Sequence, residues 1–277
     1  MGLTKPHYCD IILLVSHMTQ KRALGRRNLS VVKALAVLEL FTTQDGYLTA
    51  TQIGQALRIS QGSLYPILHA LEAAGYLIRD NGKRYRLGYK FLEKANLVLQ
   101  QSDVQSVAKP YLKDLAIRLK ANVHLGVLRN RKVLYLWREV GSGTVIISEI
   151  VGWQEPAYCT ALGKTLLAFL SEEELEEYLA QEELTPLTTY TITVATRLRE
   201  EIAIVRARGY AISDEEAHEG TVGVAAPVRG FSEQTRAGIS ISVSKTRFEK
   251  ERDVLIQAVI DVAAAISQRL GARGGGG

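Results

Sequence analysis

Three residues that are typical of acid–base chemistry lie close together in the second half of the chain: Asp214, Glu215 and His218. Two carboxylates and an imidazole within five residues are groups that general acid–base catalysis uses. On a loop that follows a strand, the same residues are equally compatible with a solvated surface. No convincing nucleophile, metal-ligand set or cofactor loop accompanies them. The sequence therefore predicts that the chain is not an enzyme, and an enzyme that processes small acids remains the alternative hypothesis.

Lys164 ends a pattern, Ala-Leu-Gly-Lys-Thr, that partly matches a phosphate-binding loop. Such a loop needs a glycine five residues before Gly163, because its backbone amides must approach the phosphates closely. Tyr158 occupies that position. The pattern therefore does not predict nucleotide hydrolysis.

The two cysteines, Cys9 and Cys159, are too few for a disulfide framework or a metal knuckle. The five histidines are scattered, and the sequence places no base beside Cys159 that would make it a nucleophile. We therefore expect packed or idle thiols, no metal, no cofactor and a cytoplasmic location. The apolar run 11–15 is far too short to span a bilayer, so no membrane partner is expected.

Positive charge is concentrated in the first third of the chain. Residues 18–90 carry a net charge of +7, the whole chain carries +5, and the part from Phe91 onward carries −2. A local basic block favours a polyanionic partner, because neutralised phosphates release condensed counterions. Composition alone fits a solvated basic surface equally well.

The elements expected in this basic part follow a recognisable order. Apolar spacing predicts a helix over 29–43 with Ser30 as a possible cap, and then a short helix capped by Thr49. A third helix ends at Gly75, and Asn81-Gly82 predicts a β-hairpin with a basic tip. This is the order of a winged helix-turn-helix, in which the third helix enters the major groove of DNA. A small helical domain that binds protein is the alternative.

Pro66 restricts where the third helix can begin, because a proline is tolerated only in the first turn of a helix. Ser63 is a good N-cap, so we expect the helix to begin near Gly62 or Ser63. Base and phosphate contacts concentrate at the amino end of such a helix and on the basic hairpin. His69 is as compatible with a solvent-facing spacer as with a contact. The predicted DNA-binding residues are Thr49, Gln61, Ser63, Tyr65, His69, Arg79, Lys83, Arg84 and Arg86.

The rest of the chain alternates strands and helices in an α+β pattern. We expect helices over 88–101 and 104–120, the second interrupted by Pro110. Strands are expected over 123–128, 132–140, 145–151, 210–213, 222–228 and 238–243. Further helices are expected over 159–169, 171–180, 198–208 and 251–270. The predicted domains are a flexible extension (1–28), a winged helix-turn-helix (29–90), a linker helix (91–104), an effector-binding and oligomerisation domain (105–272) and a tail (273–277). Met18 is an equally plausible start of translation.

Three blocks of the second part resemble the IclR family of bacterial regulators in their order and spacing. They are YCTALGKTLLAFLSEEEL (158–175), ARGYAISDEEAHEGTVGVAAPV (207–228) and AGISISVSKTRF (237–248). The resemblance implies a winged helix-turn-helix, a linker helix and a GAF-like effector domain with an antiparallel sheet. It also implies a dimer or tetramer that binds operator DNA with an affinity altered by a small metabolite.

Some positions depart from the family pattern. The usual recognition-helix pattern of the family has no proline at the position that Pro66 occupies here. The run GSLYPILHALEAAGYL (62–77) is closer to the sequences of PadR-type regulators. Where the family often has a cysteine just before the AAPV run, this sequence has Gly223. Where the family commonly has an acidic residue at the start of the DEE run, this sequence has Ser213. The departures imply different operator contacts and a ligand unlike the smallest keto acids.

A ligand pocket is predicted where small residues meet the start of a helix. Free amides at a helix amino terminus stabilise a carboxylate, and Ser240 and Ser242 share one strand face. The predicted effector-binding residues are Ala161, Leu162, Ser213, Asp214, Gly223, Ser240 and Ser242. The alternative is that these residues are buried caps and close-packing positions, and Trp137 and Trp153 form a second candidate region in which core packing is favoured.

Taken together, the residues and the resemblance predict a sequence-specific transcriptional regulator. Its expected partners are double-stranded operator DNA, a small organic acid or aromatic metabolite, and one or three further copies of the chain as a homodimer or homotetramer. The alternative is the small-acid enzyme, with the basic module serving for recruitment. The sequence specifies neither the effector, the operator nor the direction of control.

Overall fold

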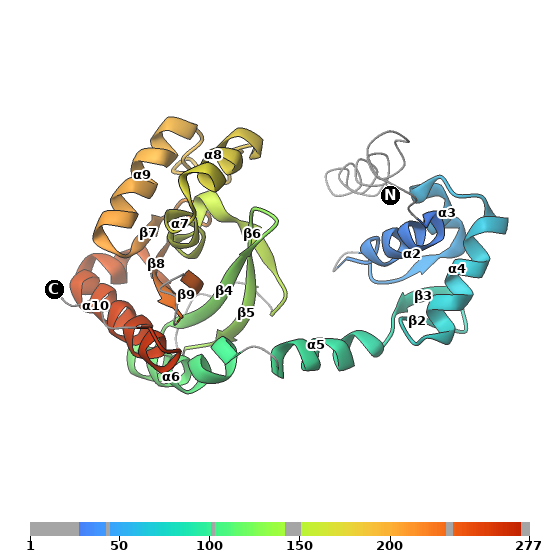
Figure 1. Cartoon of the computed structure of the whole chain (residues 1–277), viewed down its shortest axis with the longest axis horizontal. Coiled ribbons are helices and arrows are strands. Elements are labelled where there is room, and N and C mark those ends of the chain that lie inside the picture. The colour runs from blue at the N-terminus through green and yellow to red at the C-terminus, as the bar shows by residue number, and fades with distance from the viewer. Residues whose placement is uncertain (1–27, 43–44, 101–102, 142–150, 231–234, 273–277) are drawn as a thin grey trace. The chain divides into compact units, whose positions relative to one another are not determined.

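The computed structural model describes residues 28–42, 45–100, 103–141, 151–230 and 235–272, which form two compact units, 1–98 and 99–277 (Figure 1). The first unit contains helices α2 (Leu29–Glu39), α3 (Ala50–Leu57) and α4 (Gln61–Ala73) and strands β1 (Leu48–Thr49), β2 (Leu77–Arg79) and β3 (Arg84–Leu87). Helix α5 (Lys90–Gln100) follows the last strand.

The first unit is a three-helix bundle with a small antiparallel sheet in the order β1-β3-β2. Its core is formed by apolar residues from all three helices, together with Leu48, Leu77 and Tyr85 from the sheet. Helix, helix, helix and hairpin in this order confirm the predicted winged helix-turn-helix. The wing is the hairpin β2–β3, in which Asp80 N donates to Arg84 O at 2.8 Å and Lys83 has a φ of 60°.

The helix ends of this unit show which local signals are reliable. Thr49 caps α3 through a capping box with Gln52, and Gly75 follows α4 with a φ of 78°, as predicted. The predicted cap at Ser30 is wrong, because the side chain of Asn28 accepts from Ser30 N and caps α2 instead. Helix α2 also ends at Glu39, four residues before the predicted end.

The start of α4 differs from the prediction as well. The helix begins at Gln61 with Ser60 as its N-cap, and Pro66 lies inside it. The amides of Ser63 and Leu64 both donate to Ser60 O at 3.0 Å, which fixes the first turn earlier than expected. A proline at position 66 leaves the carbonyl of Gly62 without its helical donor. Because Gly62 is exposed, water can satisfy that carbonyl, and the proline is tolerated.

The second unit is an α+β domain built on one six-stranded antiparallel sheet in the order β6-β5-β4-β9-β8-β7. The strands are β4 (Asn122–Arg129), β5 (Lys132–Glu139), β6 (Gln154–Pro156), β7 (Ala211–Asp214), β8 (Thr221–Arg229) and β9 (Thr235–Ser244). The helices are α6 (Asp103–Leu119), α7 (Ala161–Ala168), α8 (Glu172–Gln181), α9 (Ala195–Arg208) and α10 (Lys245–Arg269), with a 3-10 turn at Ala157–Cys159.

Alternation along the strands gives the sheet two different faces. One set of side chains, including Val222, Val224, Ile239 and Ile241, packs with α6 and α10. The opposite face carries α7, with α8 and α9 beyond it (Figure 1). This face is where small and polar strand residues meet the start of α7.

Two expectations for this unit need correction, and a third falls almost wholly outside the described residues. Pro110 lies within α6 and does not interrupt it. Strand β5 pairs with β4 on one side and β6 on the other, and most of the strand expected over 145–151 lies outside the described residues. The last helix begins at Lys245, and the predicted start at Glu251 coincides with a residue whose φ of −118° is not helical. No helix among the described residues has the length and apolarity needed to cross a bilayer.

Candidate functional site

Helix α4 presents the predicted recognition residues on one exposed surface. Leu64, Ile67 and Leu68 are buried in the core of the first unit. The predicted contacts Gln61, Ser63, Tyr65 and His69 are all exposed. This amphipathic arrangement leaves polar and aromatic side chains available to a groove.

The wing holds its arginines against tyrosine rings. Arg79 lies 5.7 Å from the ring centre of Tyr85, Arg84 lies 5.1 Å from Tyr47, and Arg86 lies 5.4 Å from Tyr89. Stacking of this kind orients a guanidinium without neutralising its charge. The sequence prediction named these arginines and missed Tyr47 and Tyr89, whose exposure and proximity to Arg84 and Arg86 appear only in the fold.

Some of the predicted DNA-binding residues, Arg84 and Thr49 among them, have additional partners within the chain. Arg84 forms an ion pair with Asp80, with Nη2 2.9 Å from Oδ2, and its backbone amide also donates to that carboxylate. The backbone amide of Arg84 and then its guanidinium hold the pKa of Asp80 below its usual range. The hydroxyl of Thr49 is engaged with Gln52 in the helix cap, so its first role is structural.

The second unit contains a pocket between the first turn of α7 and the polar face of the sheet. Its empty volume is about 390 Å³, a figure that includes space open to solvent. It is lined by Tyr135, Glu155, Thr160, Ala161, Leu162, Ser213, Ala217, His218, Thr221, Gly223, Ser240 and Ser242. Six of the seven predicted effector residues are in this lining, and Asp214 is not.

Glycines allow α7 to approach the sheet closely enough to form the pocket. A Cβ at Gly238 would lie 2.6 Å from Leu162 Cδ1, and one at Gly163 would lie 2.2 Å from Ala157 O. A Cβ at Gly223 would lie 3.1 Å from Ala161 Cβ. Thr160 caps α7 by accepting from Gly163 N, which places Ala161 and Leu162 in the first turn. The amides of this turn are the ones for which a helix provides no partner.

The serines of the pocket come from β9 and β7, the two strands that flank β8. Ser242 is opposite Gly223 of β8, and Ser240 is opposite Ala225, so both serines lie on the face that carries α7. Ser213 of β7 is also opposite Gly223, and its hydroxyl donates to Cys159 O at 2.6 Å. Ser213 therefore braces the turn before α7.

A second polar group in the pocket was missed by the sequence analysis. Glu155 of β6 accepts a hydrogen bond from the hydroxyl of Tyr135 at 2.6 Å, and its other oxygen lies 3.0 Å from His218 Nε2. These three residues come from β6, β5 and the loop after β7. No local pattern joins positions so far apart in the sequence. Only Tyr135 could have been found, because the alternation along β5 indicates which face its side chain is on.

The acid–base cluster of the alternative hypothesis is not a common site. Asp214 forms an ion pair with Lys245, and Glu215 lies 3.9 Å from the same ammonium group. His218 is directed instead to Glu155. The two carboxylates thus share Lys245 as a partner while the imidazole faces Glu155, so the three groups do not converge on one point.

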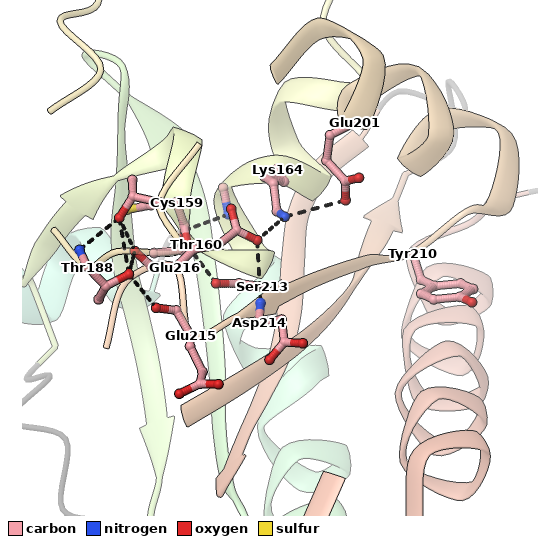
Figure 2. Close-up of polar contacts among 12 residues, drawn as sticks. Cys159, Thr160, Lys164, Thr188, Glu201, Tyr210, Ser213, Asp214, Glu215 and Glu216 are labelled. Carbon is pink, nitrogen blue, oxygen red and sulfur yellow. Dashed lines mark hydrogen bonds and ion pairs between the residues drawn. The ribbon is translucent and has the colours of Figure 1, made fainter. Parts of the chain in front are cut away.

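Lys164 is buried and belongs to an ion-pair network (Figure 2). Its Nζ lies 2.6 Å from Glu216 Oε1 and 3.4 Å from Glu201 Oε1. Burial raises the pKa of Glu216, and the charge of Lys164 opposes that change. Thr188 and Thr191 donate to backbone carbonyls of the same loop, at Glu215 O and Glu216 O. The network fixes the base of the loop that carries Ala217 and His218 into the pocket.

Cys159 is packed beneath this network. Burial, together with the nearby charges of Glu155 and Glu216, raises the pKa of its thiol to about 12. A thiol of this kind is a poor nucleophile. Among the described residues, no group of three or more histidine, cysteine, aspartate or glutamate side chains is arranged to hold a metal ion.

The two tryptophans of the second candidate region do not line the pocket. Trp137 is half-buried, lies against the core, and donates to Glu139, while Lys109 lies 4.7 Å from its ring centre. Trp153 is 42% exposed, so the expectation of core packing does not hold for it.

Comparisons with known proteins agree with this architecture. The model of the IclR helix-turn-helix domain matches residues 30–81, and the model of the bacterial transcriptional regulator IclR C-terminal domain matches residues 96–268. The chain is 32% identical to the HTH-type transcriptional regulator KipR of Bacillus subtilis, over 88% of this chain and 98% of that protein.

Solved structures show the same fold. The crystal structure of the Thermotoga maritima IclR is 31% identical, with a TM-score of 0.70 over 87% of this chain and 98% of that chain. An IclR homologue of Microbacterium hydrocarbonoxydans, complexed with 4-hydroxybenzoate, is 23% identical, with a TM-score of 0.77 over 87% and 98%. The chain belongs to the IclR family, and it is a DNA-binding transcriptional regulator with a helix-turn-helix domain followed by an IclR C-terminal domain.

Proposed function

We propose that the regulator reads operator DNA with α4 and holds the phosphate backbone with its wing. The exposed side chains Gln61, Ser63 and Tyr65 are on the amino-terminal half of α4, where a recognition helix contacts base edges. The wing supplies Arg79, Lys83, Arg84 and Arg86 as cations for phosphates. The basic excess of residues 18–90 supports this assignment.

Operator affinity, in our proposal, is controlled by a small organic acid or aromatic metabolite bound in the pocket of the second unit. The observation that carries this is the pocket itself, in which the first turn of α7 faces Ser240 and Ser242. Helix-start amides and hydroxyls together make a binding site for a carboxylate. The Microbacterium homologue, which is complexed with 4-hydroxybenzoate, supports a small-molecule ligand in this fold.

A chain with one recognition helix binds a two-fold operator only as an oligomer, and we place a homodimer or homotetramer on the DNA in the cytoplasm. Binding of the effector changes operator affinity if the effector prefers one quaternary arrangement over another. This coupling distinguishes a regulator from a protein that merely stores a metabolite.

Ser242→Leu tests the pocket, because the larger side chain fills the space beside α7. The operator is first isolated by selection from random duplexes and is then titrated with wild type and variant, with and without metabolites from a broad screen. We expect the variant to lose the response to the metabolite and to retain operator affinity in its absence. Thr189→Leu, at an exposed position outside the pocket lining, is the matched control and keeps the response.

A full response in Ser242→Leu would show that the pocket is not the effector site, and the region of Trp137 and Trp153 would replace it. Loss of folding in Ser242→Leu, with Thr189→Leu intact, would favour a structural role for the serines. Turnover of small acids by the wild-type protein would support the enzyme hypothesis instead.

A further inference from the structure

The pocket has one carboxylate in its lining and no lysine or arginine among the described residues that form it. That carboxylate is Glu155, and its residue is only 8% exposed. An anion entering the pocket therefore finds helix-start amides and hydroxyls near α7, and a fixed negative charge at Glu155. The two regions select opposite chemical groups.

Glu155 is held in place from two sides. Its strand pairs with β5 through Val133, and the hydroxyl of Tyr135 on β5 donates to Oε2 at 2.6 Å. His218, on the loop between β7 and β8, reaches Oε1 at 3.0 Å. Since β6 and β7 are at opposite ends of the strand order, the contact between His218 and Glu155 joins elements from both edges of the sheet at the pocket. The position of the carboxylate is therefore fixed before a ligand binds.

The loop that carries His218 is itself anchored. Lys164 binds the side chain of Glu216, and Thr188 and Thr191 bind the carbonyls of Glu215 and Glu216. These contacts restrain the loop just before Ala217 and His218. A preorganised acceptor discriminates more strongly between ligands than a mobile one, because it does not move away from an unfavourable group.

A carboxylate only accepts hydrogen bonds, and its two oxygens offer about four lone-pair sites. Each oxygen of Glu155 has one protein partner, so this lining residue of the pocket retains acceptor capacity. A hydroxyl or amino group of a ligand satisfies that capacity. A second carboxylate would meet a like charge in a partly desolvated site, and an apolar end would leave the acceptor unsatisfied.

We propose that Glu155 is a specificity-determining residue, and that the effector is a monocarboxylic acid with a hydroxyl or amino group at the end remote from its carboxylate. The acid end binds at the first turn of α7 with Ser240 and Ser242, and the donor end binds Glu155. The inference rests on the proposed function, because it assumes that the pocket is the effector site.

Two matched series of acids test this with the full-length protein. The aliphatic series is pentanoate, 5-hydroxypentanoate and glutarate, and the aromatic series is benzoate, 4-hydroxybenzoate and terephthalate. Each series varies only the remote end, and isothermal titration calorimetry measures the six dissociation constants. In at least one series we expect the hydroxy acid to bind about tenfold or more tightly than both other members, the ratio typical of a hydrogen bond to a charged group.

Glu155→Gln removes the charge and preserves the shape of the side chain. We expect this variant to lose most of the preference for the hydroxy acid and to bind the dicarboxylate about tenfold more tightly than wild type does. Glu177→Gln, which removes an exposed carboxylate on α8, is the matched control and leaves the ranking unchanged. His218→Ala frees one oxygen of Glu155 and should widen the preference for the hydroxy acid, and it serves as the second variant if Glu155→Gln fails to fold.

The inference is overturned if none of the six acids binds, if the dicarboxylate or the unsubstituted acid binds best to wild type in both series, or if neither variant changes the size of the preference for the hydroxy acid. The proposed function survives any of these results when some other metabolite still alters operator affinity in wild type and not in Ser242→Leu. Conversely, if no metabolite alters operator affinity, the proposed function fails even where the six acids bind in the predicted order.

Discussion

Arg84 combines three interactions at the surface of the wing. It stacks on Tyr47 and pairs with Asp80, and in the proposed function its guanidinium also contacts a phosphate. We expect Arg84→Ala to weaken binding to all duplexes and to reduce the slope of log affinity against log salt by about one unit, as one phosphate contact is lost. Fluorescence anisotropy with operator and random duplexes over a salt series measures this.

Asp80→Asn is the complementary change, because asparagine can still accept from the amide of Arg84 and no longer neutralises its guanidinium. We expect it to tighten binding to operator and random duplexes by a similar factor. If Arg84→Ala weakened binding to the operator alone, Arg84 would contact bases, and the assignment of the wing to the phosphate backbone would be wrong.

Cys159 is expected to be chemically silent in the folded protein. A thiol pKa of about 12 in place of 9.0 lowers the thiolate fraction at neutral pH about a thousandfold. In a Cys9→Ser background, iodoacetamide should label Cys159 only as fast as the second unit unfolds. Labelling that rises steeply between pH 7 and pH 9 without denaturant would contradict the burial of this thiol.

At the scale of single residues, the sequence was informative where the pattern is local. Ser240 and Ser242 were placed on one face by alternation alone, and Ala161 and Leu162 by their position at a helix start. Glu155 was missed because its partner His218 is 63 residues away and comes from another element. Asp214 was included because it follows Ser213, yet the same alternation directs it away from the pocket, to Lys245.

At the scale of elements, the helix ends that were predicted correctly are again those whose signal is local in the sequence. The capping box at Thr49 and the left-handed Gly75 are determined within a few residues and were predicted. The start of α4 was not predicted correctly. Pro66 is tolerated inside the helix because Gly62 is exposed, and that exposure is a property of the fold that the local sequence does not encode. Pro110 within α6 is a second case in which a proline did not mark a boundary.

The contact between α7 and the loop after β7 depends on the buried pair Lys164–Glu216. Lys164 and Glu216 are 1% and 6% exposed, so removing the Lys164 ammonium leaves the Glu216 carboxylate without its buried partner. We expect Lys164→Met to lower the free energy of unfolding by about 3–5 kcal/mol. Both tryptophans of the chain are in the second unit, so urea denaturation followed by tryptophan fluorescence reports on this unit.

Two further variants separate burial from charge. Lys164→Met combined with Glu216→Gln should recover part of the lost stability, because no buried charge then remains unpaired at this position. Arg199→Ala removes a cation from an exposed pair with Glu176 and should lower the free energy of unfolding far less than Lys164→Met does, because solvent screens an exposed pair. Equal losses in Lys164→Met and Arg199→Ala would show that the buried pair does not hold the loop.

At the scale of the whole molecule, the division of charge and of apolar surface indicates how copies of the chain act together. The basic excess belongs to the first unit, which suits DNA, and the part from Phe91 onward carries a net charge of −2. Apolar side chains are at least half exposed on α2, at Leu29, Val31 and Leu35, and in the second unit at Ile117 and Val254. Exposed apolar side chains on both units are compatible with contacts between copies.

We therefore expect the full chain to be a dimer or a larger oligomer in solution and on DNA. Each copy has one recognition helix, and two half-sites about one helical turn apart, roughly 34 Å, need two. Light scattering at micromolar concentration measures the mass, and hydroxyl-radical footprinting on the selected operator should show two protected half-sites related by two-fold symmetry. A monodisperse monomer, or a single protected half-site at saturation, would contradict the proposed oligomer.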